Sequence, residues 1–314
     1  MPARYRVEHT TKYVYTSPVA TSQHVAYLRP RELPYQHVRH HELRIDPSPA
    51  NGSRRTDAFG NLVNHFQILR PYSTLTVTAD SEVEVCARAG IDGERSPRWE
   101  AVSRELSGRS VSLPRGVAQF AHPSPYLPFS ESMGQFAQLS FPAGEPVLRG
   151  AIALMQRMHE QFTFDSTATT VTTPLSRVLD DRRGVCQDFA HVAISCLRAL
   201  GLAARYVSGY LLTDPPAGQP RLIGADASHA WLAVFCPVNG WVDLDPTNNV
   251  IAGERHVTVA WGRDYGDVSP LRGVLLGGAG HRLYVGVSVV PVEGQESGIG
   301  NRVSGLGKES APDT

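Results

Sequence analysis

The sequence predicts an α+β fold with two domains: a β-rich domain at the N-terminus and a second domain in which helices precede strands. Apolar residues alternate with Thr and Glu over residues 74–85, which is the period of two expected of half-buried strands. After Pro146 the apolar spacing becomes that of amphipathic helices, and segments rich in β-formers follow Gly201. Helices first and strands afterwards are typical of an α+β domain.

The first 90 residues have the pattern of short strands separated by turns, with turn signals at 46–52 and 59–61. We therefore predict a β-sandwich-like domain over residues 1–90, which is a usual domain size. Residues 91–145 mix Pro, Gly and Ser and contain one short helical pattern, over 99–106. We expect them to connect the two domains and to pack on the second.

The second domain is predicted to span residues 146–292. One helix should begin near Pro146, and a second should run from Val185 to Leu200 and stop at Gly201. The strands of this domain are predicted at 204–212, 229–236, 241–244, 256–260 and 282–291. Residues 293–314 contain Gly and Ser and almost no large apolar residues, so we expect a disordered tail.

The charge balance excludes some classes of partner. Lys+Arg and Asp+Glu both number 30, so the formal net charge is zero and no strong attraction to nucleic acid or to an anionic membrane follows. The chain begins without an apolar leader and has no run of about 18 apolar residues, so we expect a soluble, cytoplasmic protein. The four cysteines form no CxxC pair, which argues against a zinc ribbon or a disulfide scaffold.

Cys186 is the candidate nucleophile because it stands where a glycine break gives way to a helical pattern. At a helix N-terminus, unpaired backbone N–H groups and the positive end of the dipole favour a thiolate, the form that attacks carbonyl carbons. The remaining cysteines fit structural positions. Cys196 continues the apolar stripe of its helix, Cys236 alternates with apolar residues of a strand, and Cys86 ends a strand with no motif nearby.

His229 is the candidate base, because it shares a strand face with apolar residues in surroundings where electrostatic interactions are strong. His191 follows Cys186 by five residues, about 140° around a helix, so it does not face the thiol easily. It lies three residues after Asp188, and these two side chains are within pairing distance on a helix. His37, His40 and His41 lie in a predicted strand without a metal-ligand pattern, so we expect them on a solvated surface. His159 shares a helix face with apolar residues, so we expect it to be partly buried and structural.

Asp243 and Asp245 are both candidates for the carboxylate that orients the base. They are two residues apart, so on a regular strand both point to one face, and the period alone does not choose between them. A hairpin through residues 237–240 would place His229 and Asp245 at the strand ends farthest from the turn. That register favours Asp245.

Four separated motifs in this order resemble the bacterial transglutaminase-like superfamily. They are GVCQDFAH at 184–191, RYVSGY at 205–210, SHAW at 228–231 and GWVDLDPTN at 240–248. The earlier strands resemble the β-rich N-terminal domain of one bacterial branch, and WGRDYGDVSP at 261–270 resembles its closing segment.

The resemblance implies a papain-like or transglutaminase-like core, with helices packed on an antiparallel sheet or barrel. It matches Cys186 to the family nucleophile, His229 to the base and Asp245 to the orienting carboxylate, whereas Asp243 occupies a variable position. Animal transglutaminases use a tryptophan upstream of the cysteine at the oxyanion site, and no tryptophan lies between Trp99 and Trp231 here. The Cys186 N–H and a second, unidentified donor would serve instead. No separate acidic loop resembles a calcium site, so neither a metal nor another cofactor is expected.

These residues favour a thiol-dependent enzyme acting on an amide, such as a glutamine side chain of a protein or peptide, through a thioester. An amine or water would then accept the acyl group. The first alternative is a cysteine peptidase or amidase with the same three residues. The second is a non-catalytic binding protein that retains the fold.

Overall fold

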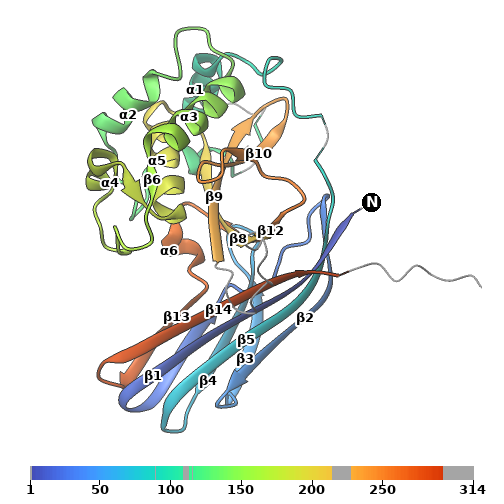
Figure 1. Ribbon diagram of the computed structural model, residues 1–314, viewed down its shortest axis with the longest axis vertical. Coiled ribbons are helices and arrows are strands. Elements are labelled where there is room, and N and C mark those ends of the chain that lie inside the picture. Colours follow the sequence, from blue (N-terminus) through green and yellow to red (C-terminus); the bar gives the residue numbers. More distant parts are fainter. Residues whose placement is uncertain (1, 89, 109–112, 115, 214–227, 293–314) are drawn as a thin grey trace, which may run out of the picture.

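The computed structural model describes residues 2–88, 90–108, 113–114, 116–213 and 228–292, so the predicted tail at 293–314 lies outside the described residues. Figure 1 shows two parts, a sheet of long strands below and a mixed helical and β unit above. The mixed α+β fold with a β-rich N-terminal region agrees with the prediction.

The N-terminal strands form one continuous antiparallel sheet of seven strands rather than two stacked sheets. Its order is β2-β5-β1-β4-β3, and β13 and β14 also pair with β1. The strands are β1 (Ala3–Ala26), β2 (Gln36–Asp46), β3 (Asn51–Thr56), β4 (Leu62–Ile68), β5 (Tyr72–Val85), β13 (Leu271–Gly277) and β14 (His281–Pro291).

The return of β13 and β14 to the N-terminal sheet corrects the predicted domain boundary, which placed all of 146–292 in the second domain. The strand predicted at 282–291 exists as β14, but it pairs with β1, with Val7 opposite Val289 and both side chains buried. The alternation of apolar residues shows that a segment is a strand without showing which sheet it joins. β1 is 24 residues long and pairs along both of its sides, and the C-terminal strands cover one of them.

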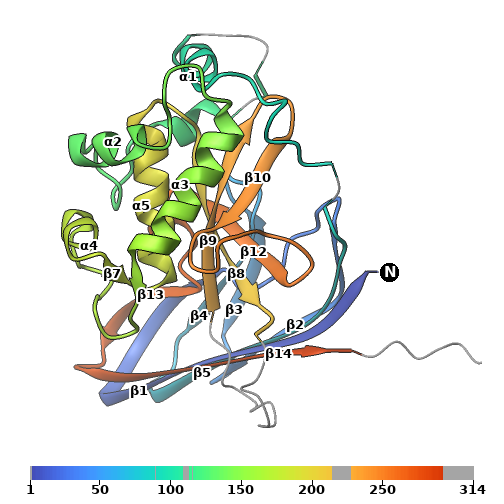
Figure 2. The same ribbon diagram turned by 45° about the horizontal axis from the view of Figure 1, so that its top comes forward.

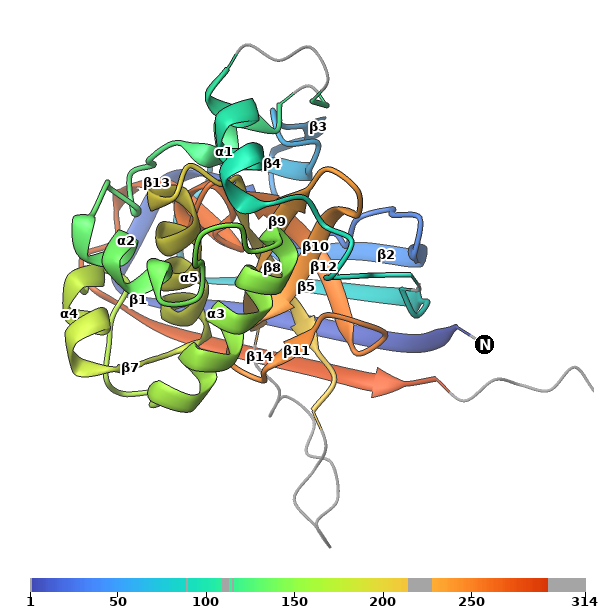
Figure 3. The ribbon, with the colours of Figure 1, turned by 90° about the horizontal axis from the view of Figure 1, so that it is seen from above.

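The second sheet has five antiparallel strands in the order β11-β10-β9-β8-β12. They are β8 (Ala204–Leu211), β9 (Ser228–Cys236), β10 (Gly240–Asp245), β11 (Val250–Ile251) and β12 (His256–Gly262). Two short parallel strands, β6 (Thr163–Phe164) and β7 (Arg183–Gly184), precede them. Seen from above in Figure 3, the helices lie on one side of this sheet and the N-terminal strands β2 and β3 lie on the other.

The helices are α1 (Trp99–Ser107), the 3-10 helix η1 (Ala118–Ala121), α2 (Glu131–Gln138), α3 (Val147–Gln161), α4 (Leu175–Asp181), α5 (Cys186–Ala199) and α6 (Tyr265–Val268). The helices predicted near 99–106, after Pro146 and before Gly201 are confirmed as α1, α3 and α5. Helices α2 and α4, of eight and seven residues, were not predicted because two turns carry too little periodicity. Among the described residues, no helix has the length and apolar character needed to cross a membrane.

α5 is the central helix of the second domain, and Figure 2 shows it beside α3 and the strands of the sheet. Its residues from Asp188 to Arg198 are all buried, and its apolar side chains belong to one core cluster with strands β8 to β10 and the ends of β1 and β5. Gly201, with a φ of 75°, lets the chain leave the helix in the left-handed conformation that glycine adopts without strain. The helix is therefore held in place along its length.

The free edge of β12 is covered by two side-chain amides of the N-terminal domain. Gln36 donates to the carbonyl of Thr258 at 2.7 Å and accepts from its N–H at 2.8 Å. Asn61 donates to the carbonyl of Trp261 at 2.8 Å and accepts from its N–H at 3.0 Å. Each amide thus takes the place of a peptide group of one more strand, and it protects an edge that would otherwise be open to another chain.

We predict that Asn61→Ala lowers the free energy of unfolding by about 2 to 3 kcal/mol, because it removes the hydrogen-bond partner of both the N–H and the carbonyl of Trp261. Equilibrium urea unfolding measures the change. The control is Asn51→Ala on the exposed edge strand β3, which should stay within about 0.5 kcal/mol of the parent protein. Equal destabilisation by the two changes would contradict the role of Asn61.

Candidate active site

Cys186 is the first residue of α5, and the chain before it is held rigidly. Residues 163–164 and 183–184 pair as β6 and β7, and Asp165 N–H donates to the carbonyl of Gly184 at 2.9 Å. Asp188 accepts from Val185 N–H at 2.9 Å and from the Thr169 hydroxyl at 2.5 Å. These two hydrogen bonds hold the Asp188 carboxylate at the start of the helix, while the Cys186 thiol is half-buried.

The first backbone donors of α5 are unpaired. Asp188 N–H and Phe189 N–H both donate to the carbonyl of Val185, but within the described chain Cys186 N–H and Gln187 N–H have no acceptor. Together with the positive end of the helix dipole, these two N–H groups make a site where negative charge is stabilised. This site lies at the thiol itself.

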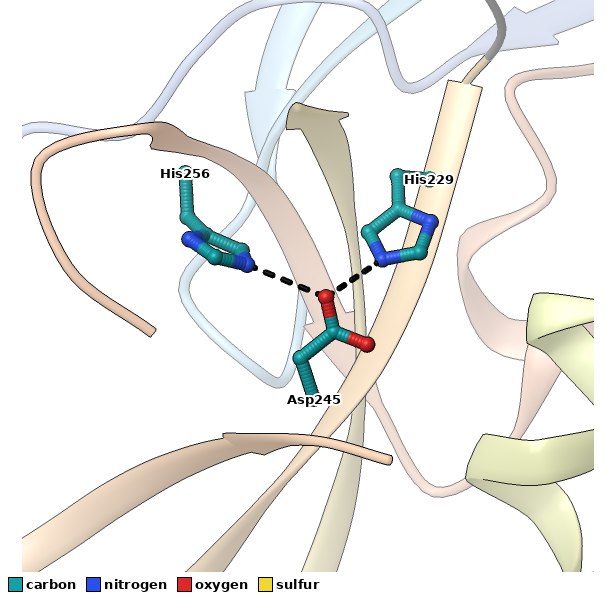
Figure 4. A group of neighbouring side chains, drawn as sticks. All are labelled: His229, Asp245 and His256. Carbon is teal, nitrogen blue, oxygen red and sulfur yellow. Dashed lines mark hydrogen bonds and ion pairs between the residues drawn. The ribbon is translucent and has the colours of Figure 1, made fainter. Parts of the chain in front are cut away.

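His229 and Asp245 meet at the end of the sheet (Figure 4), where His229 Nε2 donates to Asp245 Oδ2 at 2.7 Å. Strand β10 pairs with β9 so that Leu244 lies opposite Leu232, which puts Asp245 one diagonal step from His229. Asp243 has a different partner, since its Oδ2 accepts from Arg88 at 2.6 Å. Of the two aspartates, the structure brings Asp245 to the histidine.

Asp245 is fully buried, and its carboxylate accepts four further hydrogen bonds. Oδ2 accepts from Asn248 Nδ2 at 2.7 Å and from His256 Nε2 at 3.1 Å, while Oδ1 accepts from the N–H groups of Thr247 at 3.0 Å and Asn248 at 3.3 Å. Gly253 N–H donates to His256 Nδ1 at 3.4 Å, so the proton of this imidazole is on Nε2 and points at the carboxylate.

His256 and Asn248 were not predicted as site residues. Asn248 carried a usable signal, because an Asn three residues after a strand-ending Asp readily folds back on it. His256 carried none, since it is one of twelve histidines and reaches Asp245 only because the loop after β11 returns the chain beside it.

The electrostatics of the site follow from these contacts. Burial lowers the pKa of His229, but hydrogen bonds to Asp245 and Cys186, together with their negative charges, outweigh burial and raise this pKa to about 10. Burial raises the pKa of Asp245, but the hydrogen bonds from His229 and His256 outweigh it and hold the pKa of this carboxyl well below its usual range. A pKa raised in this way favours the imidazolium form of His229 at neutral pH, beside Asp245 and Cys186.

His229, Asp245 and His256 are also residue types that ligate metals, and their polar atoms lie within 4.8 Å of one another. The two histidine–carboxylate distances, 2.7 and 3.1 Å, are hydrogen-bond lengths with a proton between the atoms. A zinc ion at about 2.0 to 2.1 Å from each donor would push these atoms further apart. The described arrangement is that of a hydrogen-bonded network.

The other candidate residues have separate roles. His191 accepts from Tyr265 N–H at 3.1 Å instead of pairing with Asp188, and burial lowers its pKa to about 4. Cys196 and Cys236 are fully buried, and burial raises the pKa of the Cys196 thiol to about 12. His159 is exposed rather than partly buried, because it lies on the outer side of α3, where Nδ1 donates to the carbonyl of Thr247 at 3.0 Å.

Trp231 forms the wall behind the two histidines of the site. Its ring lies 6.0 Å from that of His229 and 5.2 Å from that of His256, measured between centroids, and it is completely buried. A Cβ at Gly209 would lie 2.5 Å from the Trp231 ring and 2.2 Å from the carbonyl of Val257. The glycine of the motif at 205–210 therefore makes room for the tryptophan of the motif at 228–231.

Comparison with known proteins places these features in a family. A protein of Mycobacterium tuberculosis is 41% identical over 300 residues, covering 93% of this chain and 94% of its own, and one of Mycobacterium leprae is 33% identical over 291 residues, covering 91% and 98%. A protein-glutamine gamma-glutamyltransferase of Pseudomonas aeruginosa is 38% identical over 107 residues, which are 33% of this chain and 16% of that protein.

A solved structure from Cytophaga hutchinsonii, named as a candidate cysteine protease, has the same fold, with a TM-score of 0.71 and 19% identity over 94% of this chain and 92% of its own. Residues 5–84 match the bacterial transglutaminase-like N-terminal region, and residues 137–246 match the transglutaminase-like superfamily. The chain belongs to the transglutaminase-like superfamily, in the bacterial form that carries this N-terminal region.

Proposed function

We propose that this protein is a thiol-dependent acyltransferase that acts on the side-chain amide of glutamine in a protein or peptide, with Cys186 as nucleophile, His229 as acid and base, and Asp245 as the residue that orients His229. The observation that carries the proposal is His229, whose Nε2 lies 2.7 Å from the buried Asp245 carboxylate and whose pKa is raised to about 10 by hydrogen bonds to Asp245 and Cys186. That arrangement supplies what a nucleophilic thiol needs.

In the first half of the reaction, the Cys186 thiolate attacks the amide carbon, and a C–S bond forms as the carbonyl oxygen becomes an oxyanion. The N–H groups of Cys186 and Gln187, which have no acceptor among the described residues, would donate to that oxyanion. His229 then gives its proton to the leaving nitrogen, the C–N bond breaks, and ammonia departs. A thioester on Cys186 and a neutral His229 remain.

In the second half, a primary amine or water attacks the thioester carbon, His229 takes the proton of the acceptor, and the C–S bond breaks so that the Cys186 thiolate leaves. An amine gives an isopeptide bond and water gives glutamate. The Pseudomonas relative, a protein-glutamine gamma-glutamyltransferase by name, favours the amine as acceptor. The Cytophaga neighbour, named as a candidate cysteine protease, is the reason to keep hydrolysis of amide bonds as the second candidate.

Incubation with a fluorescent primary amine and a glutamine-rich protein should give label covalently attached to the protein and release of ammonia. Cys186→Ala should abolish both, because it removes the attacking sulfur. The matched control is Cys86→Ala, which removes an exposed thiol outside the site and should leave both unchanged.

The products separate the alternatives. Ammonia without label would indicate deamidation, and new chain termini without label would indicate a peptidase. If no product forms and Cys186 reacts with iodoacetamide no faster than the buried Cys196, the enzymatic proposal is wrong and a binding role takes its place.

Replacement of Asp245 tests the charge arrangement through its pH dependence. In the parent protein the imidazolium should persist through neutral pH and be lost as the pH rises through about 10. In Asp245→Asn, burial is left to lower the pKa of His229, so the imidazolium is lost at lower pH. Alkylation of Cys186 by iodoacetamide at neutral pH should then slow by about tenfold or more.

The control for this experiment is Asp243→Asn, because Asp243 is buried on the same strand but bonds to Arg88. It should leave the pH profile of alkylation where it is, even where it lowers the melting temperature. Equal slowing in both variants would contradict the assignment of Asp245 as the partner of His229.

A further inference from the structure

A cavity lies on the face of the five-stranded sheet that carries His229, but at the other end of its strands. Its volume is about 330 Å³, and it lies between the second sheet, the N-terminal domain and the segment around η1. Most of the residues that line it are apolar or aromatic, including Phe59, Val117, Phe120, Trp241 and Trp261, and Arg205 lines it too. Arg205 pairs with Ala233, four residues along β9 from His229, which separates the two sites by about 13 Å.

Arg205 is 6% exposed, yet its guanidinium donates no hydrogen bond to any described residue. It lies between two indole rings, 3.6 Å from the centroid of Trp261 and 4.3 Å from that of Trp241. These contacts cover its faces, and within the described chain its N–H edge, including the buried Nε, has no acceptor. Arg198 is buried to a similar degree, but each nitrogen of its guanidinium donates a hydrogen bond. It donates to the carbonyls of Phe120, Ala204 and Arg263 and to the Ser124 hydroxyl.

The charge around Arg205 is also incomplete. Three guanidinium groups, those of Arg31, Arg88 and Arg205, gather here, and the carboxylates that act on them are Asp57 and Asp243. Asp243 Oδ2 is taken by Arg88 at 2.6 Å. One positive charge is therefore left over beside a cavity, and buried cations are normally paired.

We propose that this cavity binds a carboxylate attached to an apolar or aromatic body, with Arg205 holding the carboxylate and the aromatic walls covering the rest. A guanidinium edge matches a carboxylate in a bidentate geometry. A phosphate needs more hydrogen-bond donors than the Arg205 guanidinium and the Gln119 amide supply. The apolar and aromatic side chains that line the cavity would not stabilise its charge. The proposal does not depend on the chemistry proposed for Cys186.

Isothermal titration of the full chain with 3-phenylpropanoate and with its neutral amide tests the proposal. The acid should bind about tenfold or more tightly than the amide, since a hydrogen bond to a charged group is lost with the charge. Arg205→Met keeps an apolar side chain between the indoles and should bind acid and amide equally. N-acetyl-phenylalanine and its amide form a second pair, which distinguishes a peptide C-terminus from a free small acid as the natural source of the carboxylate.

Ala58→Trp gives a test that leaves Arg205 in place, because Ala58 is exposed at the rim of the cavity. It should weaken binding of the acid by about tenfold or more by filling the mouth, while Ala143→Trp, at an exposed position outside the cavity, should not. Thermal unfolding verifies that each variant is folded. Equal affinity of the parent protein for acid and amide, binding of neither at millimolar concentration, or a preserved preference for the acid in a folded Arg205→Met variant would overturn the proposal.

Discussion

The carboxylate of Asp245 is the group on which the geometry of the candidate active site depends. It is fully buried, and its five hydrogen bonds come from three places in the chain: the start of β9, the loop that follows β10, and the start of β12. A buried charge is tolerated only where such bonds replace water. The same bonds that keep Asp245 ionised therefore fix the strands and set the direction of the His229 ring.

This arrangement puts the two halves of the site on supports of different kinds. Cys186 depends on a helix whose inner turns are entirely buried, whereas His229 depends on hydrogen bonds at the end of a sheet. The sheet is steadied in turn by Gln36 and Asn61, which bind the backbone of β12 from the N-terminal domain. That domain thus acts on the site through the strand that carries His256 at its beginning.

The features that the sequence made predictable were those with a local signal. The start of α5 at Cys186 follows from the glycine break and the helical spacing, and the choice of Asp245 over Asp243 follows from hairpin register and the family motif. His256 and the partner of β14 were beyond such reasoning, because both depend on contacts between distant segments. The period of two predicts that residues 287 and 289 face a core, but it does not predict which of the two domains that core belongs to.

The pairing of β14 with β1 has a consequence for how the chain folds. Residues 3–85 and 271–291 build one sheet, so the second domain is an insertion within the first. The chain enters the second domain once, after β5, and returns from it once, before β13. During synthesis the inserted unit emerges whole before the strands that complete the outer sheet leave the ribosome. Loop closure over about 270 residues is entropically expensive, and prior compaction of the insertion brings its two ends together and reduces that expense. Folding of the domain with the candidate active site thus brings β14 close to β1, with which it pairs.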